Sequence, residues 1–137
     1  MKSLIIAVQF MTRLPMPRVH AKDASFAASM RWFPAAGLIV GLFVCVGAWS
    51  GTHVDPLLGA LLALVTWTTI TGALHLDGLG DIADASGGAH RDPERLQEIL
   101  ADPRAGTFAV VTIGLQLLAK FPPLSLLLDK GAIWPLA

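Results

Sequence analysis

The sequence is poor in charged residues, in cysteine and in basic runs. Only 15% of its 137 residues are charged, whereas soluble domains contain about 25%. Its one cysteine, Cys45, excludes an internal disulfide and gives no basis for a zinc site. The net charge is zero and Lys and Arg form no run, so nucleic acid is not expected as a partner.

The sequence is instead rich in apolar residues. They make up 54% of the chain, the mean hydropathy is +0.63, and they fall in long blocks of the length that a bilayer requires. The predicted fold class is all-α, a polytopic transmembrane helical bundle with three spans present and a lipid bilayer around it. Five segments are expected: a cytoplasmic or interfacial segment 1–29, span one 30–50, span two 57–76, a cytoplasmic acidic loop with a short helix 77–105, and span three 106–128.

The distribution of basic residues predicts the topology. Span one and span two form a hairpin, because the connection 51–56 is short and turn-like. No Lys or Arg lies between Arg31 and Arg91. Arg13, Arg18, Lys22 and Arg31 lie before or at the start of span one, and Arg91, Arg95 and Arg104 follow span two. By the positive-inside rule, both the N-terminus and the segment 77–105 are cytoplasmic.

Small residues and prolines refine the spans. Gly37 and Gly41 have the four-residue spacing that permits close contact between membrane helices. Pro122-Pro123 is expected to kink or break span three near its far end.

Three carboxylates at the end of span two carry the chemical information. If the helix continues, Asp81 lies about 40° from Asp77 and Asp84 about 20° to the other side, so the three share one stripe. Two carboxylates about 6 Å apart repel by roughly 3 kcal/mol at an effective dielectric near 20. A divalent cation relieves this repulsion, and hard oxygen ligands that also face phosphates favour Mg2+. The alternative is an ordinary solvated acidic helix end.

Two glycines between these acids and a histidine just before them each have two interpretations. Gly78 and Gly80 are poor helix formers, so they either leave room for a phosphate ligand or pack closely against a neighbouring span. His75 is better explained as a packed or hydrogen-bonded side chain than as a metal ligand.

A second polar group precedes span three. A short helix beginning near Asp92 carries Glu98 and Asp102, and Asp102 is expected to join Asp77, Asp81 and Asp84 as a metal ligand. Arg104 is expected to contact phosphate, with a juxtamembrane anchor as the alternative. The N-terminus of span three adds exposed N–H groups and a favourable dipole. Lys120 is either functional or an anchor.

Four stretches resemble the cobalamin synthase family, also called adenosylcobinamide-GDP ribazoletransferase. They are Phe10-Met11-Thr12-Arg13-Leu14-Pro15-Met16-Pro17, Arg31-Trp32-Phe33-Pro34-Ala35-Ala36-Gly37-Leu38, the segment from Thr71 to Asp84, and Asp102-Pro103-Arg104-Ala105-Gly106-Thr107-Phe108. The His-Leu-Asp-Gly-Leu-x-Asp-x-x-Asp piece is the specific one. The chain departs from the family pattern at Gly80, Pro103 and Ala105. Members of the family are longer and have further spans, so the chain is expected to be an N-terminal part with spans missing.

The resemblance implies a Mg2+-dependent transferase of cobalamin biosynthesis in the bacterial inner membrane, with its active site facing the cytoplasm. The hydroxyl of α-ribazole, or of α-ribazole 5′-phosphate, would attack the cobinamide-linked phosphorus of adenosylcobinamide-GDP, and GMP would leave. Asp81 or Asp84 is expected to accept the proton, Arg104 to assist, and Gly78 and Gly80 to line the bound ligand. The sequence leaves open whether a homo-oligomer forms.

Two other functions remain as alternatives. A CDP-alcohol phosphotransferase also uses an aspartate-rich membrane helix, but the Ala-Arg expected after its Asp-Gly is replaced here by Ala83-Asp84. A non-enzymatic cation-handling protein would hold its site near the bilayer midplane, whereas these aspartates lie at a predicted cytoplasmic boundary.

Overall fold

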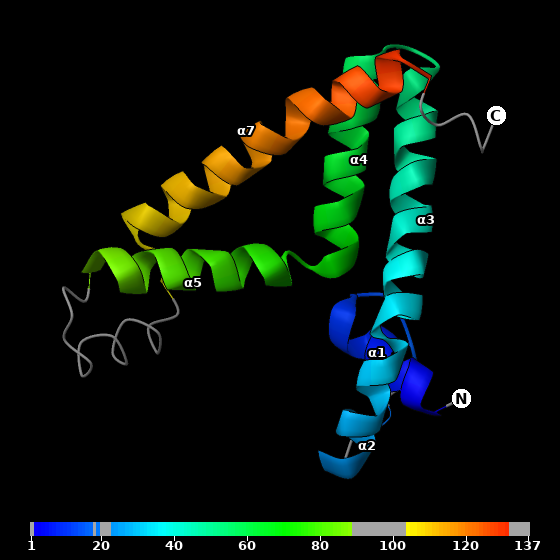
Figure 1. Cartoon of the computed structure of the whole chain (residues 1–137), viewed down its shortest axis with the longest axis vertical. Coiled ribbons are helices and arrows are strands. Elements are labelled where there is room, and N and C mark those ends of the chain that lie inside the picture. Colours follow the sequence, from blue (N-terminus) through cyan, green and yellow to red (C-terminus); the bar gives the residue numbers. More distant parts are fainter. Residues whose placement is uncertain (1, 18, 20–22, 89–103, 132–137) are drawn as a thin grey trace. The chain divides into compact units, whose positions relative to one another are not determined.

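The computed structural model describes residues 2–17, 19, 23–88 and 104–131, and all regular structure within these ranges is helical. The helices in chain order are α1 (Lys2–Met11), α2 (Asp23–Ser29), the 3-10 helix η1 (Met30–Trp32), α3 (Phe33–Thr52), α4 (Pro56–Thr71), α5 (Leu74–Gly88) and α7 (Thr107–Asp129) (Figure 1). The predicted all-α class is therefore confirmed.

Several helices have the length and composition of membrane spans. Ser25–Thr52 and Thr107–Asp129 are each long and apolar enough to cross a membrane, and α4 with α5 gives a third crossing if the pair is one broken span. Large apolar side chains such as Leu38 and Leu118 are exposed on these helices. Such surfaces suit a lipid environment. The described residues thus contain two or three candidate spans, in agreement with the predicted polytopic bundle.

The described residues divide into two compact units, one up to Ala73 together with the end of α7 from Leu124, and one from Leu74 to Pro123. In the first unit α3 and α4 lie side by side as the predicted hairpin (Figure 1). A Cβ placed on Gly51 would lie 2.6 Å from the Cα of Gly59, and one on Gly47 would overlap the Thr66 side chain. Glycine is therefore required where these two helix backbones meet.

The predicted small-residue contact uses a different pair of glycines. Among the described residues, nothing lies within 4 Å of a Cβ built on Gly37 or on Gly41. The four-residue spacing that makes the contact is Gly47 with Gly51, further along the same helix. A contact at Gly37 and Gly41 stays a prediction, because spacing alone does not say which face of a helix meets its neighbour.

Helix α1 packs against the start of α3. Ala7, Val8 and Ala36 form a buried apolar cluster. The ring of Phe10 stacks on that of Phe33, with centroids 5.8 Å apart, and meets the ring of Phe26 edge-on at 5.1 Å. These contacts hold α1 in the first unit. The location of α1 at a membrane interface stays a prediction.

The predicted second span, residues 57–76, is not one continuous helix. Helix α4 ends at Thr71, because Gly72 takes a left-handed conformation (φ 62°) and donates its N–H to the carbonyl of Thr69 at 3.2 Å. Ala73 is also left-handed (φ 57°), and α5 begins at Leu74. The side chain of Arg13 covers Gly72, where a Cβ would lie 2.6 Å from the Arg13 Cγ. The acidic motif therefore lies on a separate helix.

At Pro122-Pro123, where a kink or break of span three is predicted, the helix is not broken. Helix α7 continues from Thr107 to Asp129 with Pro122 and Pro123 inside it. Each proline lacks an N–H donor, but its fixed φ angle is compatible with a helix. Membrane helices tolerate proline when the freed carbonyls find other partners.

Candidate active site

The three aspartates of the motif lie on α5 but in different surroundings. Asp77 and Asp81 are exposed and one turn apart, whereas Asp84 is half-buried. The shared stripe expected from the helical spacing is present, because the helix is unbroken from Leu74 to Gly88. The exposed pair, Asp77 and Asp81, forms what we call the acidic face of α5.

Asp84 is held by the start of α7. Its Oδ2 accepts a hydrogen bond from the backbone N–H of Gly106 at 2.6 Å, and its Oδ1 accepts one from the N–H of Ala109 at 2.9 Å. From the sequence, the N–H groups at the start of this helix are expected to be available to a phosphate. Two of them, those of Gly106 and Ala109, instead donate hydrogen bonds to Asp84. The sequence gives no direct signal for this contact, since the partners are 22 and 25 residues apart.

The two glycines between the acids have different surroundings. A Cβ on Gly80 would lie 3.1 Å from the Cβ of Ala109 and 3.2 Å from the Cδ1 of Ile113, and Gly80 is buried. Of the two interpretations of Gly80, these distances favour close packing against a neighbouring helix over room for a ligand. Gly78 is exposed, and among the residues that the structure describes a Cβ added to it would meet nothing within 4 Å. This surrounding is compatible with the ligand interpretation of Gly78, which stays a prediction.

The other predicted site residues are only partly placed. Arg104 is exposed and lies two residues before Gly106. Asp102 and the short helix expected near Asp92 lie outside the described residues. His75 is exposed in the first turn of α5, and Lys120 is half-buried on α7. These positions do not decide between the alternatives for His75 or for Lys120.

The acidic face fits only a particular type of metal site. Across residues 2–17, 19, 23–88 and 104–131, no three His, Cys, Asp or Glu side chains are grouped to hold a metal ion. A cage made of protein ligands alone is therefore not present in that part of the chain. Mg2+ is commonly held by one or two carboxylates together with substrate phosphates and water. The hard oxygens of Asp77 and Asp81, exposed one turn apart, fit this second type.

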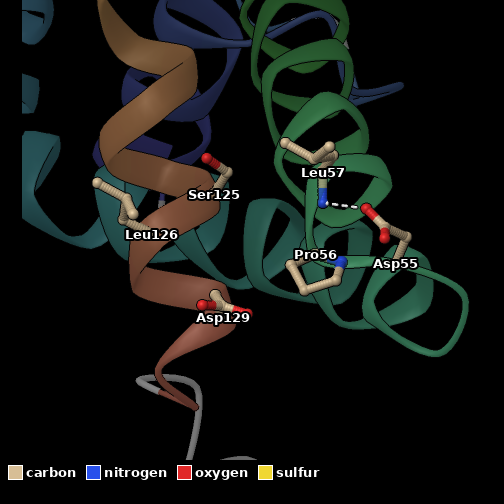
Figure 2. A pocket seen from close by; sticks show the side chains of 6 residues that line it. All are labelled: Asp55, Pro56, Leu57, Ser125, Leu126 and Asp129. Atoms are coloured by element: carbon tan, nitrogen blue, oxygen red, sulfur yellow. Dashed lines mark hydrogen bonds between the residues drawn. The ribbon is translucent and has the colours of Figure 1, made fainter.

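A separate pocket lies between the start of α4 and the end of α7. It is lined by Asp55, Pro56, Leu57, Ser125, Leu126 and Asp129 (Figure 2). The Asp55 carboxylate accepts the N–H of Leu57 at 2.7 Å and so caps α4. The pocket contains none of the residues that the sequence predicts for the site, and capping accounts for Asp55.

The helices define an α-helical membrane protein, and one of its helices carries two exposed carboxylates one turn apart. Comparison with known sequences gives the family: the family model described as Cobalamin-5-phosphate synthase matches residues 3–137. The chain belongs to this family. No solved structure matches the chain.

Individual relatives agree with the family assignment. The chain is similar to proteins named Adenosylcobinamide-GDP ribazoletransferase from three bacteria. The Novosphingobium aromaticivorans protein is 57% identical over 136 residues, covering 96% of this chain and 55% of the relative. Those of Thiobacillus denitrificans (51% over 136 residues) and Laribacter hongkongensis (53% over 135) each cover 98% of the chain and 55% of the relative. The chain thus spans about half the length of the relatives it matches.

Proposed function

We propose that the whole protein is an adenosylcobinamide-GDP ribazoletransferase of cobalamin biosynthesis. It transfers the GDP-activated adenosylcobinamide phosphoryl group to α-ribazole or its 5′-phosphate, giving adenosylcobalamin or its 5′-phosphate. The family match over residues 3–137 carries the proposal, and the names of the relatives support it. The reaction is balanced: a new P–O bond forms to the ribazole oxygen, the bond to the GMP oxygen breaks, and the hydroxyl proton passes to a base.

The acidic face suits this reaction because displacement at a diphosphate requires charge neutralisation and alignment above all. In the proposal Asp77 and Asp81 hold Mg2+ together with the substrate phosphates, and Arg104 contacts a phosphate oxygen. Mg2+ bound there would supply positive charge to the diphosphate and the leaving GMP. Gly78 is exposed between the two aspartates, so it would leave room for the bound phosphate. Asp81 is also a proposed proton acceptor, and Asp102 stays a predicted further ligand.

A transfer assay tests the proposed function. Membranes containing the whole protein are supplied with adenosylcobinamide-GDP, α-ribazole and Mg2+, and the cobalamin product and GMP are quantified. We expect both products in equal amounts and neither when Mg2+ is removed. Activity on a CDP-alcohol donor with no ribazole transfer would contradict the proposal and favour the phospholipid alternative.

The proposed orientation places the acidic face in the cytoplasm and the hairpin turn at 51–56 on the other side of the bacterial inner membrane. It rests on the basic residues that flank only the open end of the hairpin. The test labels single cysteines in intact cells with a membrane-impermeant reagent, on a Cys45→Ala background. We expect labelling of His53→Cys and protection of Gly88→Cys, and the opposite pattern would reverse the topology.

A further inference from the structure

Asp84 joins two helices that are far apart in the sequence. The first N–H groups of a helix have no partner within it and need acceptors from elsewhere. At α7 this acceptor is supplied by α5, since Asp84 binds the N–H groups of Gly106 and Ala109 at 2.6 and 2.9 Å. Its negative charge also lies at the positive end of the α7 dipole. Both oxygens of the carboxylate are thus engaged in holding α7.

Two glycines near Asp84 allow the close approach of α5 and α7. A Cβ on Gly106 would lie 2.6 Å from the Asp84 Oδ1, so the close approach of the carboxylate requires glycine there. A Cβ on Gly87 would lie 2.5 Å from the Phe108 ring, so the same two helices also touch one turn further along α5. We call the contact formed by Asp84, Gly87, Gly106, Phe108 and Ala109 the α5–α7 clasp.

The residues of α5 that face α7 form a stripe of their own. Gly80 packs on Ala109 and Ile113, and with Asp84 and Gly87 it repeats at spacings of four and three residues. Such spacing places the three on one side of a helix. Asp84 therefore lies at the margin between this packing stripe and the acidic face.

We propose that Asp84 is a positioning residue, which fixes the start of α7 on α5 and so sets the place of Arg104 relative to the acidic face. In this role Asp84 is neither a metal ligand nor the proton acceptor, the two roles that the sequence suggested for it. The contribution to activity rests on the proposed function, whereas the clasp itself is a structural claim that can be measured separately.

Two single substitutions break the clasp from opposite sides. Asp84→Asn replaces one acceptor oxygen with an NH2 group that cannot accept the N–H facing it. Gly106→Ala keeps the charge of Asp84 but introduces a methyl group into the space that its Oδ1 occupies. Gly114→Ala, on the same helix as Ala109, is the matched control, because no described residue lies within 4 Å of its Cβ position. All are made in the whole protein, together with the Asp84→Asn/Gly106→Ala double variant.

The experiment measures transfer rates across a Mg2+ titration and thermal unfolding of the solubilised protein. We expect Asp84→Asn and Gly106→Ala each to lower the maximal rate by about 10- to 100-fold, as loss of supporting contacts around a site does. The Mg2+ concentration for half-maximal rate should stay at the wild-type value. The double variant should be no slower than the slower single variant, because both remove the same contact. Gly114→Ala should match wild type.

Other results would overturn the proposal. Wild-type rate and unfolding temperature in Gly106→Ala would show that the clasp does not matter. A raised Mg2+ requirement in Asp84→Asn would make Asp84 a ligand. If Asp84→Asn does not accumulate in membranes, the rate and Mg2+ dependence of Gly106→Ala still decide the question. If the wild-type protein shows no transfer, the proposed function fails, and equal, non-additive decreases in unfolding temperature still support the clasp.

Discussion

Asp81→Asn is expected to lower the rate of ribazole transfer at low Mg2+ on the order of 100-fold, with partial recovery at high Mg2+. Asp81 is exposed on α5, one turn from Asp77. Asn keeps the size of the side chain but removes its charge and a hard oxygen ligand, so metal affinity should fall. The measurement is the initial transfer rate of the whole protein across a Mg2+ titration.

Ser86→Ala provides the control for this prediction. Ser86 is exposed on the same helix, about 180° around the axis from Asp77. The Ser86→Ala substitution should leave both the transfer rate and its Mg2+ dependence unchanged. If Asp77→Asn and Asp81→Asn are expressed normally and keep the wild-type transfer rate and Mg2+ dependence, the acidic face is not part of the active site.

Gly51→Ala is expected to destabilise the α3–α4 hairpin by about 1–3 kcal/mol, the usual cost of overpacking. The added Cβ would lie 2.6 Å from both the Cα and the N of Gly59. These are backbone atoms within a helix, so they cannot move aside as a flexible side chain would. The decrease should be measured as a lower thermal unfolding temperature of the solubilised protein.

Gly41→Ala is the matched substitution on the same helix. No described residue lies within 4 Å of its Cβ position, so the unfolding temperature should stay at the wild-type value or rise slightly. Equal stability of the two variants would contradict the helix contact at Gly51 and Gly59.

The apolar blocks predicted the helices because a bilayer imposes a minimum length on an uncharged helix. The hairpin followed from the short connection, and α3 and α4 confirm it. The sequence does not predict the end of α4, because residues 57–76 are uncharged apart from His75 and no charged residue marks the break. Gly72 was the available signal, since glycine is the residue most often found just after the end of a helix.

The candidate site was predictable only in part, for a similar reason. Helical periodicity places Asp77 and Asp81 on one face, and the structure has both exposed there. Periodicity cannot reveal that the backbone N–H groups of Gly106 and Ala109 donate hydrogen bonds to the Asp84 carboxylate, because these bonds join separate parts of the chain. Periodicity also cannot decide whether Gly78 and Gly80 leave room for a ligand or pack against another helix. In the structure α7 packs against Gly80, through Ala109 and Ile113, and not against Gly78.

Direct binding of a divalent ion tests the central claim that the acidic face holds the metal of the transfer reaction. The whole protein is titrated with Mn2+ in the presence of adenosylcobinamide-GDP, and bound ion is followed by electron paramagnetic resonance. We predict binding that Mg2+ displaces in the wild-type protein and in Ser86→Ala, and its loss in the Asp77→Asn/Asp81→Asn double variant. Unchanged Mn2+ affinity in that double variant would contradict the account.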